Sequence, residues 1–456
     1  MKDIYLVNYS VKGIKSLDQL VSLSFYKKTI SPNPDTQEYN IKGIYGMNGS
    51  GKSGIVTSVD ILRNILINPG YLSNPIVQKD LDEIINKKTG KIFIEADYIV
   101  KLSKELLLYR YDVEVSKNIA GRYVIFHESL AYKKATSKSE RLEGLFEISD
   151  GEVIFISNKQ KTDSFPNILV NKTMNLLTTA SLCAIFYEKF LLSDFLDSNI
   201  KKSILVRDIC TLYILGRKLQ VYIEQSDNHR EYITRNSLEY YDDSNKYKRD
   251  SLINSYLEVE NTYLNVISIT DNIVPQRIYP HFEENVQKLY DFLHIFKTDL
   301  RKIEIDKKEN GDFWICDLVM VYQSYKIHAE FESTGIKKLI HLFAYLKDMA
   351  QGGIVFIDEL DSNLHDVYLC ALLEYLAEYG EGQLCFTTHN VGPMDVLKQR
   401  KKSIDFLSEN HKIYPWTTNG NYSPSKLYRN GMIEGSPFNV DSIDFIGVFE
   451  SDREGE

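Results

Sequence analysis

The chain has 456 residues, of which 43% are hydrophobic and 26% are charged. This composition supplies enough apolar material for a packed core and excludes an intrinsically disordered protein. The 54 basic and 63 acidic residues leave a net charge of -9, which argues against non-specific coating of nucleic acid, although a local basic groove stays possible. No apolar run is long enough to span a membrane, and the five cysteines form no C-x-x-C pair. We therefore expect a cytoplasmic protein with reduced thiols.

The first third of the chain has the pattern of strands around one helix. Residues 4–9 and 20–25 are rich in β-forming residues, and a third predicted strand, residues 41–45, runs directly into a glycine-rich turn. Apolar residues at helical spacing predict a helix over residues 54–67. Three further β-rich runs, expected to form an antiparallel meander, cover residues 92–100, 106–115 and 122–131.

The middle of the chain is mainly helical in pattern. Residues 167–274 contain no proline and almost no glycine, which predicts a helical insertion. An amphipathic helix is predicted over residues 283–302, because apolar residues recur there at steps of three and four. The remaining predicted elements are a hairpin (314–322 and 325–331), helices over 336–349 and 366–379, and strands over 354–357 and 384–387.

The strongest chemical signal is a glycine-rich segment that matches G-x-x-x-x-G-K-[ST] between a predicted strand and a predicted helix. Its glycines allow backbone amides at a helix N-terminus to surround phosphate oxygens, while Lys52 brings a positive charge to the β- and γ-phosphates. Ser53 would bind Mg²⁺. The alternative, a merely flexible loop, is disfavoured by the flanking strand and helix. The sequence thus predicts a site for ATP and Mg²⁺ that includes Gly46, Asn48, Gly49, Ser50, Gly51, Lys52 and Ser53.

Two acidic residues and one histidine follow later predicted strands. Asp358 and Glu359 come directly after four apolar residues, and carboxylates at the C-terminal end of a buried strand are costly unless a metal ion or hydrogen bonds use them. Asp358 would hold Mg²⁺, and Glu359 would activate the attacking water. Taken alone, the pair could also be solvated acids in a turn. His389 follows the strand over residues 384–387 and could contact the γ-phosphate.

These segments, in this order, resemble ATP-binding-cassette (ABC) type ATPases of the branch that contains RecF, SMC and OLD-like proteins. Residues 358–365, Asp-Glu-Leu-Asp-Ser-Asn-Leu-His, are similar to the Walker B motif and D-loop of that branch. Residues 331–339 are similar to its signature segment, E-S-x-G-x-K-x-L. The sequence departs from the family in having no L-S-G-G-Q, and Gln78 is only a weak candidate for the Q-loop glutamine.

The resemblance implies a dimer with shared sites. In that family the serine and glycine of the signature segment close over the γ-phosphate held by another subunit, so Ser333 and Gly335 imply a homodimer or higher homo-oligomer. These residues also precede a predicted helix, whose N-terminus attracts phosphate. Without the resemblance, Ser333 would pass as an ordinary N-cap.

The resemblance also implies an architecture. It predicts an α/β fold, namely an ABC-type ATPase head with a mixed phosphate-loop sheet, an antiparallel β subdomain and a large α-helical insertion. The first half of the head would be residues 1–160, with the insertion over 161–302. The second half would be residues 303–395, followed by a C-terminal extension over 396–456.

Compact members of this branch with an E-S-x-G signature commonly occur in bacterial anti-phage and abortive-infection systems, such as PARIS and Septu. There the ATPase senses or scaffolds, and an effector nuclease acts. Because residues 390–456 leave too little room for a fused nuclease, the resemblance implies a nuclease encoded nearby and a phage protein as a possible trigger. Hydrolysis of ATP would be slow or regulated.

The competing class is a DNA-repair ATPase that clamps DNA, as RecF and SMC proteins do. Two basic runs are candidate contacts for DNA phosphates, although such runs are more often only solvated. A membrane-transporter subunit is disfavoured, because the signature departs from the transporter form. The basic runs are Lys246, Lys248 and Arg249, and Lys398, Arg400, Lys401 and Lys402.

Overall fold

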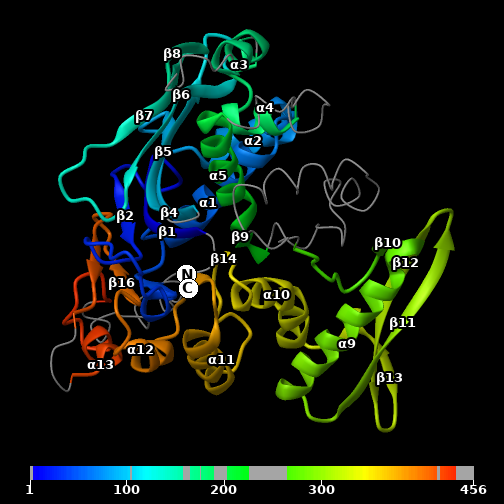
Figure 1. Ribbon diagram of the computed structural model, residues 1–456. Coiled ribbons are helices and arrows are strands. Elements are labelled where there is room, and N and C mark those ends of the chain that lie inside the picture. The colour runs from blue at the N-terminus through cyan, green and yellow to red at the C-terminus, as the bar shows by residue number, and fades with distance from the viewer. Residues whose placement is uncertain are drawn as a thin grey trace, which may run out of the picture.

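The computed structural model of the chain describes residues 4–102, 105–157, 165–174, 176–188, 203–224, 264–417 and 422–437. Three sheets organise this part of the chain (Figure 1). An antiparallel sheet lies at the top of the view, a mainly parallel sheet lies below it, and a smaller antiparallel sheet stands to one side. The predicted phosphate loop belongs to the mainly parallel sheet, so that sheet positions the candidate site.

The mainly parallel sheet has the strand order β17-β16-β3-β15-β14-β9, and only its β16–β17 pair is antiparallel. Helices cover both of its faces. In β14, Ile354 and Phe356 join one core and Val355 and Ile357 join the other, as predicted for a strand buried on both sides. The strands are β3 (Ile41–Tyr45), β9 (Leu219–Tyr222), β14 (Ile354–Ile357), β15 (Gln383–Thr387), β16 (Ile404–Leu407) and β17 (Ile413–Pro415).

The large antiparallel sheet has the order β2-β1-β4-β5-β6-β7-β8. The predicted meander is confirmed as β4, β5 and β6, whereas β7 and β8 were not predicted. Buried tyrosines tie the sheet to neighbouring helices: Tyr9 Oη lies 2.7 Å from Ser58 Oγ. The strands are β1 (Ile4–Lys12), β2 (Val21–Ser24), β4 (Lys91–Leu102), β5 (Glu105–Lys117), β6 (Tyr123–Lys134), β7 (Glu143–Ser149) and β8 (Glu152–Ile156).

Helices fill the space between the two large sheets and cover the outer face of the parallel one. Helix α1 packs against α4, α5 and β9, while α10 packs against β9 and β14 (Figure 1). The helices are α1 (Lys52–Ile67), α2 (Pro75–Ile84), α3 (Phe165–Thr173), α4 (Leu182–Phe186), α5 (Ile204–Lys218), α10 (Thr334–Ala350), α11 (Asp366–Tyr379), α12 (Gly392–Leu397) and α13 (Pro424–Arg429). Short 3₁₀ helices are η1 (Gln37–Tyr39), η2 (Tyr71–Ser73), η5 (Gln276–Ile278) and η6 (Ala329–Phe331).

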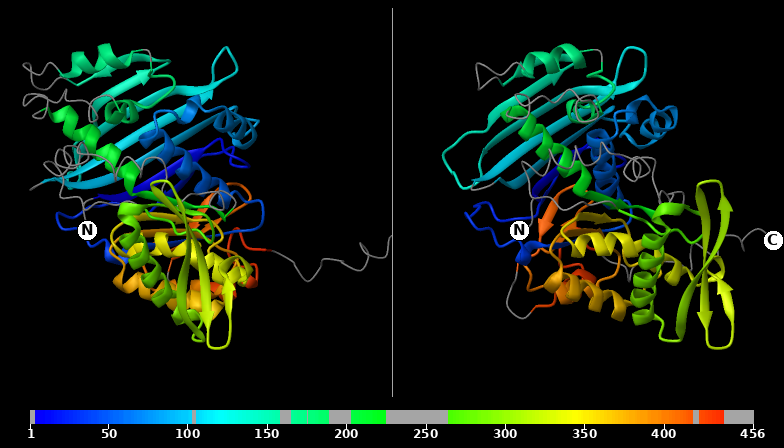
Figure 2. Two further views of the ribbon diagram at one scale, coloured as in Figure 1. Left: turned by 90° about the vertical axis from the view of Figure 1, so that its right-hand side faces the viewer. Right: turned by 45° about the vertical axis from the view of Figure 1, so that its right-hand side comes forward.

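Helix α9 and the third sheet form a lobe beside the parallel sheet, as Figure 2 shows. The helix predicted to end at residue 302 ends at Phe296 instead, because Leu300 already pairs with Tyr322 of the neighbouring strand. The predicted hairpin is confirmed as β12 and β13. The elements are β10 (Asn272–Pro275), α9 (Tyr279–Phe296), β11 (Leu300–Asn310), β12 (Phe313–Tyr322) and β13 (Lys326–His328).

The fold is therefore α/β, with a mixed sheet that carries the phosphate loop and a separate antiparallel subdomain, as predicted. The predicted helical insertion, residues 161–302, contains α3, α4, α5 and α9, but also β9, which is a strand of the head itself. The domain limits stay predictions. All five cysteines are free thiols, and none of the helices in the described ranges is both long and apolar enough to cross a bilayer.

Candidate active site

Three predicted functional segments begin at the same edge of the parallel sheet. Strand β3 leads into the phosphate loop, β14 into Asp358 and Glu359, and β15 into Thr388 and His389. Because β3, β15 and β14 are adjacent and parallel, their C-terminal ends lie side by side. Ligands of open α/β sheets bind at this edge.

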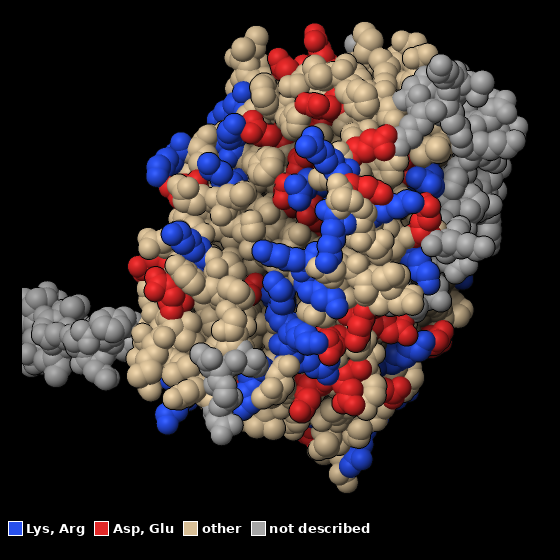
Figure 3. Space-filling model, turned by 60° about the vertical axis from the view of Figure 1, so that its left-hand side comes forward, with Lys and Arg blue, Asp and Glu red and all other residues tan. Residues whose placement is uncertain are grey.

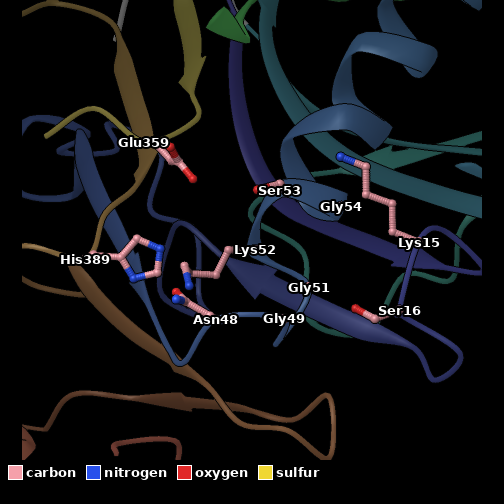
Figure 4. A pocket seen from close by; sticks show the side chains of 10 residues that line it. All are labelled: Lys15, Ser16, Asn48, Gly49, Gly51, Lys52, Ser53, Gly54, Glu359 and His389. Atoms are coloured by element: carbon pink, nitrogen blue, oxygen red, sulfur yellow. The ribbon is translucent and has the colours of Figure 1, made fainter. Parts of the chain in front are cut away.

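A pocket of about 720 Å³ opens at this edge. Figure 4 shows Asn48, Lys52 and His389 grouped on one side of it, with Glu359 facing the same space. Seven predicted residues thus line one cavity, whereas Gly46, Ser50 and Asp358 are not in its lining. The full lining is Lys15, Ser16, Asn48, Gly49, Gly51, Lys52, Ser53, Gly54, Glu359 and His389.

Two glycines of the phosphate loop are required by their surroundings. Gly51 has a φ of 106°, and a Cβ atom there would lie 2.3 Å from a methyl carbon of Leu17. At Gly46 a Cβ atom would lie 2.4 Å from the carbonyl oxygen of Leu407. Any larger residue would push the loop away from β16 or from the turn at Leu17, so the tight loop depends on glycine.

The N-terminus of α1 faces the pocket without a side-chain cap. Gly51 occupies the N-cap position, and no acidic residue lies in the first turn of the helix. The amides and the helix dipole at such an end attract an anion. Lys52 adds a cation: its side chain is 5% exposed, and its Nζ donates hydrogen bonds to the carbonyl oxygens of Gly46 (2.7 Å) and Met47 (3.0 Å). Burial lowers the pKa of Lys52, against the opposing effect of nearby carboxylates.

Thr387, at the end of β15, joins the two acidic residues that follow β14. Its Oγ1 donates to Asp358 Oδ1 (2.6 Å) and accepts from the backbone N–H of Glu359 (2.8 Å). Glu359 has a φ of 48°, a left-handed conformation that is uncommon for a residue with a side chain. Thr387 therefore stabilises the turn that directs the Glu359 side chain into the pocket.

Asp361 connects this turn to the segment that carries His389. Its two carboxylate oxygens accept from the backbone N–H groups of His389 (3.4 Å) and Asn390 (3.1 Å). The His389 side chain is exposed and lines the pocket. The positions of Glu359 and His389 thus depend on each other through Asp361.

The donor set at this edge fits Mg²⁺, which prefers oxygen ligands and keeps places for water and substrate phosphates. The Ser53 hydroxyl lines the pocket. Burial lowers the pKa values of both Lys52 and Lys15, and the Asp358 carboxylate lies close enough to oppose that lowering at each of them. The described residues contain no cluster of three or more His, Cys, Asp or Glu side chains that would hold a metal ion without a substrate. Ser53 and Asp358 are the residues whose side-chain oxygens could hold Mg²⁺ beside a bound nucleotide.

The signature residues lie outside the pocket of their own chain. Ser333 is exposed and caps α10, accepting a 3.4 Å hydrogen bond from the N–H of Ile336. Gly335 faces the D-loop, where a Cβ atom would lie 2.6 Å from the carbonyl oxygen of Asn363. Ser333 is thus an ordinary N-cap, as one interpretation of the sequence predicted. Its exposed position is compatible with a further role at the surface.

Sequence reasoning missed Lys15 and Ser16, which line the pocket opposite His389 (Figure 4). They lie in a tight turn held by a hydrogen bond from the N–H of Lys15 to the carbonyl oxygen of Ile84 (2.6 Å). A signal for them in the sequence is Lys15 itself, a basic residue two positions after Gly13. Gln78 is not in the pocket lining: its side chain bonds the backbone N–H and carbonyl groups of Tyr123, so it fastens α2 to β6.

In a comparison with known protein families, part of the chain matches one family. Residues 222–395 match the family model described as "AAA domain, putative AbiEii toxin, Type IV TA system". The matched residues include Ser333, Glu359 and His389, whereas the phosphate loop precedes them. The match supports an ATPase of the AAA type. The sequence matches none of the curated proteins with which it was compared.

Among solved structures, the chain is similar to the recombination mediator protein RecF of the RecFOR pathway, in two structures titled as complexes with ATP and with "ATPrS". Identity is 12% in both, and the alignments cover 91% of this chain and 99% or 100% of RecF. The TM-score of 0.38 is too low for this likeness to carry weight.

Proposed function

We propose that this protein is an ATPase that cleaves MgATP in sites shared between two copies of the chain. One observation carries the proposal: a single pocket joins the uncapped N-terminus of α1 and Lys52 with Glu359 and His389. Phosphate groups would lie against the α1 amides and the Lys52 ammonium. Mg²⁺, when bound, supplies charge neutralisation at the phosphates.

The chain's own residues take three roles in this proposal. Glu359 orients the attacking water and accepts its proton, because its carboxylate enters the pocket from the strand end beside the phosphate loop. His389 donates a hydrogen bond to the γ-phosphate oxygen. Lys52 stabilises the negative charge that develops on the phosphates during cleavage.

The exposed position of Ser333 supports a site completed by a second copy. Mixing two inactive variants tests this. Lys52→Ala removes the phosphate loop's cation, and Ser333→Arg blocks the signature segment, so each variant alone is expected to be inactive. In a dimer containing one of each, one of the two shared sites is intact, and random pairing then gives at most about a quarter of wild-type ATPase activity, and less where the two sites are coupled. No recovery, although mixed dimers form, would mean that sites are not shared.

We propose further that the ATPase belongs to a bacterial anti-phage system and controls a separate effector, with a nuclease as the expected effector. The description of the matching family, which names the AbiEii toxin and a type IV TA system, supports a role in defence. The test is to isolate the protein from cells carrying its native operon, with and without phage infection, and to identify what copurifies. A neighbouring gene's nuclease that binds only in one nucleotide state would support the proposal. No associated product under any condition would contradict it.

Thr387→Val is expected to slow ATP hydrolysis about tenfold while ATP affinity changes little, because the change removes the hydrogen bonds that hold Asp358 and Glu359 but touches no phosphate contact. The matched control is Thr388→Val, since the neighbouring Thr388 hydroxyl contacts Asn390 and not the acids. Single-turnover hydrolysis and fluorescent-nucleotide titration measure the two quantities. If both variants slow hydrolysis equally, then the hydrogen bonds of Thr387 to Asp358 and Glu359 are not needed for the reaction.

A DNA-clamping ATPase is the alternative function, and a basic cluster favours it. Lysines and arginines gather in the middle of one face, directly above acidic residues (Figure 3). Lys402 lies near Lys28, but Lys401 is paired with Glu38, so the basic run at residues 398–402 is partly neutralised. The second basic run, residues 246–249, lies outside the described residues. Fluorescence anisotropy with duplex DNA at several salt concentrations distinguishes the alternatives, because clamping requires tight, nucleotide-dependent binding.

A further inference from the structure

Lys338 connects the signature helix to the turn that carries Glu359. Its side chain is 2% exposed, although lysine is rarely buried. Its Nζ donates to the carbonyl oxygen of Glu359 (2.5 Å) and to the Oγ of Ser362. The Ser362 hydroxyl lies in turn 3.4 Å from a carboxylate oxygen of Glu224, two residues after the end of β9. The Lys338 ammonium group thus connects α10 to the turn at residues 359–363, which is called the Walker B turn below.

Other residues at the start of α10 also lie close to the turn that carries Glu359. The Thr334 hydroxyl lies 3.4 Å from Asn363 Oδ1, and Gly335 leaves no space for a side chain against the Asn363 carbonyl. Both Glu359 and Asn363 have positive φ angles, 48° and 61°. A turn with two residues in this conformation needs support from its surroundings, and the first two turns of α10 provide it.

The electrostatics of Lys338 agree with a supporting role. Burial lowers the pKa of Lys338, while four nearby carboxylates oppose that effect. Removing the ammonium would leave these carboxylates facing one another with less compensation. The four carboxylates belong to Glu224, Asp361, Glu359 and Asp358.

We propose that Lys338 is a positioning residue that couples the signature segment to the Glu359 turn of the same chain. The inference rests on the proposed function, because it needs shared sites. If Ser333 and Gly335 serve the partner's nucleotide, then a movement of α10 on phosphate contact reaches Glu359 of this chain through Lys338. A nucleotide bound in one shared site thereby positions Glu359, the proposed base, in the other shared site. The two sites are then energetically coupled.

Lys338→Met tests this, because methionine keeps an unbranched apolar side chain, one atom shorter, but loses the donors and the charge. We expect ATP affinity to stay within about threefold of wild type and hydrolysis to fall about tenfold or more. Coupled sites predict a sigmoidal dependence of rate on ATP concentration for the wild type, and a hyperbolic one for the variant. Lys338→Arg, which keeps a cation and donors, should restore much of the rate. Lys347→Met is the matched control: Lys347 lies on the same helix, but bonds Asn285 of α9, 2.9 Å away.

The outcomes separate the two proposals. Wild-type protein that neither binds nor hydrolyses ATP would overturn the proposed function itself. Wild-type protein that hydrolyses ATP, with Lys338→Met changing rate and affinity no more than Lys347→Met, would overturn only the role of Lys338. If Lys338→Met is unstable, Ser362→Ala removes one of the two acceptors on the turn, and the inference then requires a slower rate at unchanged affinity. An unchanged rate in that variant would contradict it.

Discussion

Lys52→Ala is expected to lower ATP affinity at least about 100-fold, because the change removes the charge-assisted hydrogen bonds to the β- and γ-phosphates. The α1 amides alone would then have to neutralise the triphosphate. The loss should also be steeper for ATP than for AMP, since AMP lacks both phosphates that the lysine reaches. Isothermal titration calorimetry with the two nucleotides measures this.

The control for Lys52→Ala is Lys79→Ala, which removes the same charge from an exposed position on α2. Lys52 also bonds the carbonyl groups of Gly46 and Met47, so a melting temperature must show that the variant still folds. A folded Lys52→Ala protein with wild-type affinity for ATP would refute the phosphate-loop assignment.

Glu359→Gln is expected to keep ATP binding and to lower hydrolysis about 100-fold or more, because glutamine matches glutamate in size but cannot accept a proton. The hydrogen bonds that hold the turn involve the Glu359 backbone, and they remain in this variant. With cleavage blocked, two copies should stay closed around uncleaved ATP. Light scattering after size-exclusion chromatography should therefore show a larger dimer fraction in the variant with ATP and Mg²⁺.

Glu374→Gln on the exposed face of α11 makes the same chemical change away from the pocket and should leave both hydrolysis and assembly unchanged. If Glu359→Gln turns over ATP at the wild-type rate, then Glu359 is not the base. If hydrolysis stops but ATP causes no association of two copies, then Glu359 is the base, and the proposal that two copies share each site is wrong.

The sequence predicted those parts of the site that depend on adjacent residues. The phosphate loop is recognisable because β3, the glycines and the start of α1 are consecutive in the chain. Asp358 and Glu359 are recognisable because a fully buried strand of four residues directly precedes them. The predicted strand ends do meet at one pocket, because parallel neighbours bring their C-terminal ends to the same edge.

Residues that act through distant neighbours were not predictable in this way. Thr387 looks like any polar residue at a strand end until β15 is placed beside β14. Lys338 belongs to the polar pattern of a helix, and only the packing of α10 on the Walker B turn buries it. Strand β9 was predicted as part of a helical insertion, because its four residues, Leu-Gln-Val-Tyr, directly follow a long helix and are too few to show a periodicity of their own.

The sequence by itself thus determined the local chemistry: a loop that can surround phosphate, a pair of carboxylates after a buried strand and a histidine after another. The reason is that backbone geometry over a few residues follows from glycine, helix and strand patterns. Only the tertiary structure decided which side chains support those groups. Lys15, Thr387 and Lys338 are distant in sequence from the groups beside which they lie, and folding brings them together. Their positions depend on which strands become neighbours and how α10 lies on the sheet, and that is a property of the whole core.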